Sequence, residues 1–128
     1  MSTFLFNFKK EFAPRVESGE KRQTIRRTRK DNRRPRPDDI AKLYTGLRTR
    51  SVRLLRTERV VECMGVRMFY DDKVIIIDGR KLEVSDAHEF AVADGFESIS
   101  QMIGWFKHQG EISLSGDSSE FEGFCTRW

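Results

Sequence analysis

Short apolar stretches separated by polar turns run along the chain, and most have the length and composition of β-strands. Residues 3–8 are rich in Phe and alternate poorly, which predicts a strand buried on both faces. Residues 52–64 mix Val, Leu and Arg over a length that fits one or two strands with a kink near Thr57. Further strands are expected at residues 24–26, 40–44, 67–70, 74–77, 81–84 and 121–128.

Two polar turns join strands that lie close together in the sequence. Asp71-Asp72 separates residues 67–70 from 74–77, and Asp78-Gly79 is a strong signal for a two-residue hairpin. Strands at this spacing, connected by tight turns, predict a small antiparallel β-barrel that is closed or nearly closed.

Three short helices are predicted beside these strands, at residues 9–18, 87–93 and 98–106. The first ends at Gly19, which fits a left-handed residue after a helix. The second is expected to be capped by Ser85 or Asp86. The third begins with the capping-box spacing Ser98-x-x-Gln101. The fold class is therefore α+β, a small antiparallel β-barrel with two or three short helices.

Length and composition predict a single domain over residues 1–128. No stretch approaches the roughly 20 apolar residues of a membrane span, and the first residues have no basic leader, so we expect a cytoplasmic protein. Cys63 and Cys125 lack the spacing of metal ligands and are interpreted as buried thiols. We therefore predict no metal and no other cofactor. The polar segment 110–120 is expected to be a flexible loop.

Charge is distributed unevenly along the chain. Residues 1–60 contain 18 Lys or Arg and 7 Asp or Glu, whereas residues 61–128 contain 6 and 13. This asymmetry indicates one basic face suited to a polyanion, so a nucleic acid or nucleotide is the expected partner.

The most basic segment, residues 28–37, contains two prolines and no apolar side chain, which predicts a loop. It is either a mobile hydrophilic excursion or an arm that grips phosphates. Arginine predominates over lysine there, which favours bidentate phosphate contacts and stacking on bases. The arginines expected to bind nucleic acid or substrate are Arg22, Arg26, Arg27, Arg33, Arg34 and Arg36.

The residues best placed for chemistry follow Gly19. If residues 24–26 are a strand, Thr24 and Arg26 point to one side and Ile25 to the other. Lys21 lies in the preceding turn, and its stem can bring the amine back to the Thr24 hydroxyl. The alternative is a solvated basic turn that leads into a strand.

Hydrolysis of an amide needs a nucleophile, a base, a proton for the leaving amine and a counter-charge for the oxyanion. The Thr24 hydroxyl is the candidate nucleophile. Lys21 is the candidate base, provided that burial and the neighbouring arginines lower its pKa.

The spacing Gly19-x-Lys21-x-x-Thr24-x-Arg26 resembles the signature of the ASCH domain, a branch of the PUA-like β-barrels that handle RNA and modified nucleobases. The family usually has Glu at the position of Thr24, and threonine there is similar to the small bacterial ASCH proteins that hydrolyse N4-acetylcytidine. The resemblance extends over nearly the whole chain, through residues 37–46, 94–106 and 124–128.

The resemblance implies that Asp94 is the catalytic acid, because it matches the position of a glutamate just before the C-terminal helix of those amidohydrolases. Asp94 is one methylene shorter than glutamate, and as a residue beside Gly95 it also fits an ordinary turn or cap. His88 and His108 are interpreted as surface residues.

Tyr44 is a further candidate for recognition, since an aromatic ring on a strand beside the pocket stacks on a base. The alternative is ordinary packing in a half-buried sheet.

We predict an amidohydrolase that removes an acyl group from a modified cytidine, with Lys21, Thr24 and Asp94 as catalytic residues. The alternative is a non-catalytic module that binds single-stranded RNA or a modified nucleobase, and a weaker one is a ribonuclease. The size and basic loop suit a bacterial or bacteriophage protein, and the oligomeric state is left open.

Overall fold

The computed structural model describes residues 1–113 and 119–128, which form strands and helices in an α+β arrangement. The elements follow the order β1 (Thr3–Phe8), α1 (Ala13–Ser18), β2 (Gln23–Arg27), β3 (Ile40–Thr45), β4 (Arg53–Arg59), β5 (Glu62–Phe69), β6 (Val74–Ile77), β7 (Arg80–Lys81), α2 (Val84–Ala93), α3 (Ile99–Ser113) and β8 (Glu120–Arg127).

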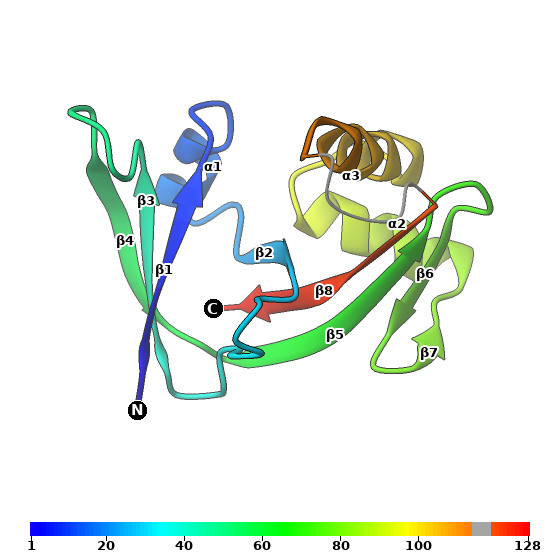
Figure 1. Ribbon diagram of the computed structural model, residues 1–128, viewed down its shortest axis with the longest axis horizontal. Helices are drawn as coiled ribbons and strands as arrows, with labels where there is room; N and C mark the ends of the chain where they lie inside the picture. Colours follow the sequence, from blue (N-terminus) through cyan, green and yellow to red (C-terminus); the bar gives the residue numbers. More distant parts are fainter. Residues whose placement is uncertain (114–118) are drawn as a thin grey trace.

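Strand pairing over the described residues produces two sheets rather than one closed barrel. The smaller sheet has the order β1-β3-β4 and the larger one β2-β8-β5-β6-β7. The prediction of purely antiparallel strands is wrong at β1, which pairs with β3 in parallel. In Figure 1 the smaller sheet stands at a steep angle to the larger one, while α2 and α3 cover one face of the larger sheet.

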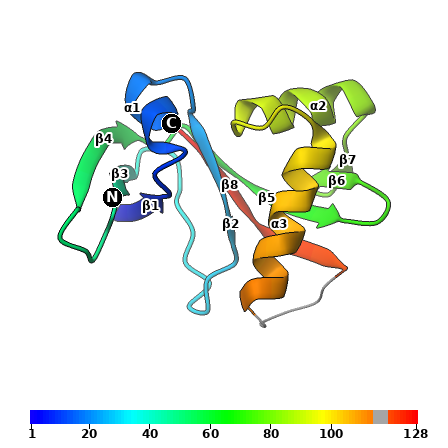
Figure 2. The same ribbon diagram turned by 90° about the horizontal axis from the view of Figure 1, so that it is seen from above.

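Two apolar clusters hold these layers together. The larger contains side chains from β2, β5, β6 and β8 packed under α2 and α3, including Met68, Met102 and Phe121. The smaller contains the inward side chains of β1, β3 and β4 with α1 and Trp128. Phe12 contacts both clusters, so the turn that leads into α1 lies between the two sheets. Figure 2 shows α3 crossing the larger sheet when seen from above.

Several boundaries differ from those expected. β1 is buried on one face only, because Leu5 points outward and is 53% exposed. The break near Thr57 falls instead at Val60 and Val61, where the chain passes from the smaller sheet to the larger. There the Val60 amide bonds to Asp39 and the Val61 amide to Arg127.

The helices also differ from the expected ranges. α1 begins at Ala13 rather than Lys9, with Pro14 in its first turn, where its missing N–H costs no helical bond. No side-chain hydrogen bond caps α2, whose N-cap is Glu83 rather than Ser85 or Asp86. α3 continues to Ser113, so residues 110–113 are helical rather than part of a loop. Of the rest of the predicted loop, residues 114–118 lie outside the described residues, and Glu120 begins β8.

Other expectations are confirmed. Asp78 and Gly79 both have positive φ, at 48° and 82°, and join β6 to β7 as a hairpin. Cys63 and Cys125 are free cysteines, but only Cys125 is buried as expected, whereas Cys63 is partly buried. No helix in the described part of the chain is long and apolar enough to cross a bilayer.

Candidate active site

The motif lies where α1 leads into β2. Gly19 ends α1 with φ of 85°, and its N–H donates to the Val16 carbonyl at 3.2 Å. The Lys21 amide then donates to the Arg15 carbonyl at 2.9 Å, which fixes the turn before β2. β2 runs antiparallel to β8, so the predicted strand over residues 24–26 is confirmed within Gln23–Arg27.

Lys21 forms a buried ion pair with Asp94, which directly follows α2. The Lys21 Nζ lies 3.2 Å from Asp94 Oδ1, and the two side chains are 4% and 6% exposed. The same Nζ donates to the Asp94 carbonyl at 2.6 Å. Arg15 holds the next residue in place by donating to the Gly95 carbonyl at 2.6 Å. The segment carrying Asp94 is therefore fixed by residues of α1 and of the turn after it.

Burial changes the protonation of both members of this pair. Loss of solvation lowers the pKa of the Lys21 ammonium, against the opposing attraction of Asp94. Loss of solvation likewise raises the pKa of the Asp94 carboxyl, against the opposing attraction of Lys21. Each shift is toward the uncharged form of its group, which is the free amine for Lys21 and the carboxylic acid for Asp94.

Gln23 contacts the same carboxylate oxygen of Asp94 as Lys21 does. Its Nε2 donates to Asp94 Oδ1 at 3.3 Å, and its Oε1 accepts from Arg127 Nε at 3.1 Å. Arg127 is held in turn by Glu62, with 3.0 Å between Nη1 and Oε1. Because Arg127 offers only donors, it orients the Gln23 amide so that the NH₂ group faces the carboxylate.

Thr24 and Arg26 lie on the same side of β2, as the strand periodicity predicts. Arg26 Nε donates to Thr24 Oγ1 at 2.9 Å, and Arg26 Nη2 donates to the Asn7 carbonyl at 2.7 Å. The guanidinium lies 5.1 Å from the Phe8 ring centre. Burial lowers the pKa of Arg26, and the attraction of Asp94 opposes this shift. A guanidinium keeps its proton in proteins, so Arg26 is charged.

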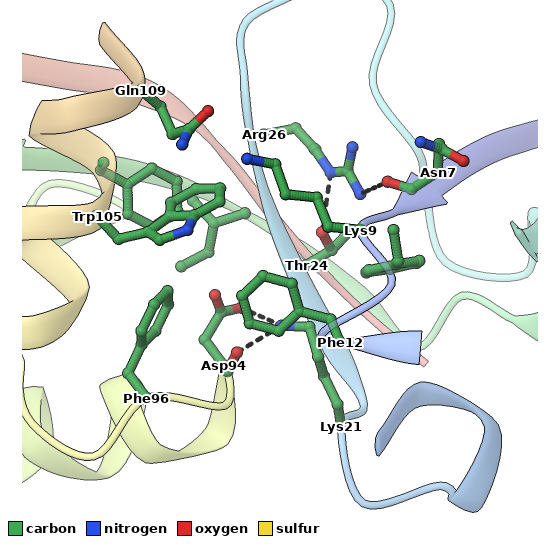
Figure 3. A pocket seen from close by; sticks show the side chains of 13 residues that line it. Asn7, Lys9, Phe12, Lys21, Thr24, Arg26, Asp94, Phe96, Trp105 and Gln109 are labelled. Carbon is green, nitrogen blue, oxygen red and sulfur yellow. Dashed lines mark hydrogen bonds and ion pairs between the residues drawn. The ribbon is translucent and has the colours of Figure 1, made fainter. Parts of the chain in front are cut away.

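These residues meet at one cavity of about 300 Å³ between β2, the end of β1 and α3. Lys21, Thr24, Arg26 and Asp94 all line it, and Figure 3 shows Lys21 reaching from the turn before β2 toward Asp94. No hydrogen bond joins Lys21 to Thr24 in the described structure, since Nζ bonds to Asp94 instead. The facing wall consists of aromatic side chains, namely Phe12, Phe96, Trp105 and Phe106.

The aromatic wall is assembled from distant parts of the sequence. Phe12 contacts Trp105 at 6.0 Å and Phe96 at 6.1 Å between ring centres, both edge to face. Lys9 lies 5.3 Å above the Trp105 ring at the mouth of the cavity. Lys21 Nζ lies 5.5 Å from the Phe12 ring. A cavity with an aromatic wall and a few convergent polar groups is typical of a small-molecule site.

The remaining predicted binding residues do not line this cavity. Arg33, Arg34 and Arg36 border a separate hollow of about 750 Å³ near the N-terminus. Tyr44 lies at one of the half-exposed positions of β3 that alternate with the buried ones. The structure therefore places Arg26 at the same cavity as Lys21, Thr24 and Asp94. The basic loop and Tyr44 lie away from this cavity.

Arg22 and Arg27 also lie elsewhere. Arg22 is exposed and donates to the Trp128 carbonyl at 3.1 Å. The Arg27 guanidinium lies over the Phe121 ring at 5.1 Å. His88 and His108 are exposed and do not line the cavity.

Sequence reasoning missed Gln23 and the role of the aromatic wall. Phe12 and Trp105 have the helical spacing of core residues, which hides their exposure to a cavity. Strand alternation could have pointed to Gln23, because it is a polar residue on the same face of β2 as the core residue Ile25.

Comparison of the chain with protein family models, with curated proteins and with solved structures found no match.

Proposed function

We propose that the protein is an ASCH-type, PUA-like amidohydrolase that removes the acyl group from a modified cytidine such as N4-acetylcytidine. The observation that carries the proposal is the convergence of Lys21, Thr24 and Asp94 on one cavity with an aromatic wall. Such a wall suits a planar base. A nucleoside substrate would place the activity in the cytoplasm.

In the proposed first half-reaction, the Thr24 oxygen attacks the acyl carbonyl carbon while its proton passes to the Lys21 amine. The tetrahedral intermediate collapses by breaking the bond to N4, and Asp94 gives N4 its proton. Cytidine leaves and the acyl group stays on Thr24. Water then attacks the acyl ester and releases the carboxylic acid, restoring the hydroxyl and both protonation states.

Two features of the site support these roles. Both pKa shifts of the buried pair favour the protonation states that a base and an acid require. Arg26 donates to Thr24 Oγ1, so its positive charge stabilises the oxygen as the proton leaves.

Chromatography of cytidine released from N4-acetylcytidine tests the proposal. Thr24→Val keeps the shape of the side chain but removes the hydroxyl, and we expect its turnover to fall by about 10²–10⁴-fold. Thr24→Ser restores a hydroxyl and should recover measurable activity. A Thr24→Val enzyme as active as the wild type would exclude Thr24 as the nucleophile.

A second candidate function, binding of single-stranded RNA, is favoured by the hollow beside the basic loop. The guanidinium of Arg33 lies 5.2 Å from the Phe4 ring and that of Arg34 lies 4.8 Å from the Phe124 ring. Each guanidinium lies over an aromatic ring while its residue remains exposed, so its N–H groups are available to a phosphate.

Fluorescence anisotropy with a single-stranded RNA tests this second function. Binding should weaken steeply with salt, because each bound phosphate releases counterions. Changing Arg33, Arg34 and Arg36 together to Gln should reduce the slope of log K against log salt by about 0.7 for each phosphate that the variant no longer binds. Thr24→Val should leave binding unchanged. Affinity that does not depend on salt would contradict a phosphate-binding role for the loop.

A further inference from the structure

β2 is an edge strand of the larger sheet. Over the described residues its only sheet neighbour is β8, and the order is β2-β8-β5-β6-β7. One row of β2 backbone groups therefore bonds to β8, while the alternate row points away from it. The residues that belong to the second row can present backbone donors to whatever lies beside the strand.

Two hydrogen bonds just beyond the strand ends identify the rows. The Trp128 amide donates to the Arg22 carbonyl at 3.1 Å, and the Thr28 amide donates to the Glu122 carbonyl at 3.3 Å. Bonded and non-bonded pairs alternate in an antiparallel ladder, so the even-numbered residues of β2 bond to β8. The N–H and C=O groups of Ile25 then point to the free edge.

The cavity is lined by Ile25 and also by Thr24 and Arg26, which lie on the opposite face of β2, so it adjoins the free edge of the strand. Ile25 lines the cavity and is only 5% exposed, and its N–H donates to no backbone or side-chain acceptor in the described structure. Buried backbone N–H groups are almost always paired. A donor without a protein acceptor at this point, one residue after the candidate nucleophile, is available to an acceptor that binds in the cavity.

We propose that the backbone N–H of Ile25 is a catalytic oxyanion donor that binds the acyl carbonyl oxygen of the substrate. This inference rests on the proposed hydrolysis. When the Thr24 oxygen bonds to the acyl carbon, the carbonyl π electrons move onto the carbonyl oxygen, and that oxyanion accepts the Ile25 hydrogen bond. When the bond to N4 breaks, the electrons return and the carbonyl is restored in the acyl-Thr24 ester.

The Ile25 N–H belongs to the residue directly after the proposed nucleophile, Thr24, which is a position that suits an oxyanion donor. In hydrolases built on a nucleophile elbow, the N–H of the residue after the nucleophile forms half of the oxyanion hole. Arg26 cannot fully replace it, because its Nε and Nη2 are already bonded to Thr24 and Asn7. The fixed strand also holds the donor in place without any movement during the reaction.

The test replaces one amide by an ester in the full chain. Residues 1–62 are synthesised with Ile25 as its α-hydroxy analogue and ligated at Cys63 to residues 63–128. This change keeps the isoleucine side chain, removes the N–H and makes the Thr24 carbonyl a weaker acceptor. We expect the kcat for N4-acetylcytidine to fall by about 10²–10³-fold, with little change in KM. An ester variant that folds and retains the kcat of the unmodified ligated protein overturns the assignment.

The matched control is the same ester at Leu5. β1 is also an edge strand, and the donation from the Ile40 amide to the Ser2 carbonyl places the Leu5 N–H on its unpaired side. Leu5 does not line the cavity, so this ester should leave kcat unchanged.

A binding measurement separates failure of this inference from failure of the proposed function. In ¹⁵N-labelled protein, N4-acetylcytidine should shift the Ile25 amide proton downfield and leave that of Leu5 unmoved, whether or not turnover follows. If the unmodified protein releases no cytidine but the Ile25 shift appears, the hydrolysis is wrong and the backbone site stands. If Ile25 shows no shift, the backbone site is wrong.

Discussion

Replacing Lys21 with methionine is expected to lower the proposed hydrolysis of N4-acetylcytidine by about 10²–10⁴-fold, because it removes the amine proposed to take the Thr24 proton. The same change leaves Asp94 buried without its counter-charge, which costs about 3–5 kcal/mol of unfolding free energy when the carboxyl is ionised. Cytidine release and urea denaturation measure the two effects.

The stability cost should depend on pH. Without Lys21 the pKa of Asp94 rises further above its ordinary value, so the native state holds a proton that the unfolded state releases at about pH 4. The free energy of unfolding then falls as pH rises toward the raised pKa. The penalty relative to the wild type should therefore be larger at about pH 8 than at about pH 5.

Lys42→Met is the matched control, since Lys42 lies at a half-exposed position of β3 and does not line the cavity. It should leave activity unchanged and alter stability by no more than about 0.5 kcal/mol. If Lys21→Met retained wild-type turnover, Lys21 could not be the base.

Replacing Gly123 with alanine is expected to disrupt the strand that carries the site. A Cβ at Gly123 would lie 2.0 Å from the Arg26 carbonyl oxygen and 2.8 Å from the Phe121 ring. Both neighbours are held in place, so β2 must move away from β8. The loss of unfolding free energy should reach or exceed the upper end of the about 1–3 kcal/mol typical of overpacking.

Activity should fall together with stability in Gly123→Ala, because moving Arg26 also displaces the adjacent Thr24 and Ile25. Gly104→Ala is the control: its Cβ would meet nothing within 4 Å on α3, and alanine there should stabilise the helix by about 1 kcal/mol. Thermal denaturation compares the two. Equal stability of both variants would show that β2 does not approach β8 as closely as the structure indicates.

Local structure was largely predictable from the sequence, because it depends on neighbours in the chain. Gly19 ends α1 in the left-handed conformation, and Asp78-Gly79 forms the hairpin, as their residue types require. Helix ends were less predictable. α3 extends seven residues beyond the expected Phe106, since polar residues after the apolar stripe neither favour nor prevent further turns.

Long-range pairing was not predictable from these patterns. The parallel contact between β1 and β3 joins residues almost 40 positions apart, and nothing in either stretch specifies direction. Likewise, the passage from one sheet to the other at Val60 depends on backbone bonds to Asp39 and Arg127 rather than on a turn signal.

The site was predictable only where strand periodicity or resemblance applied. Periodicity placed Thr24 and Arg26 together, and resemblance pointed to Asp94, which the structure places 3.2 Å from Lys21. The basic loop was expected beside this site because its arginines suit the same anionic ligand. However, proximity in sequence does not fix proximity in space. Its arginines border a different hollow.

The most direct measurement is the amount of cytidine that a known amount of the protein releases from excess N4-acetylcytidine. We predict many molecules of cytidine per molecule of protein, and almost none from the Lys21→Met, Thr24→Val double variant. No cytidine from the wild type, or equal amounts from both proteins, would contradict the hydrolytic role of this cavity.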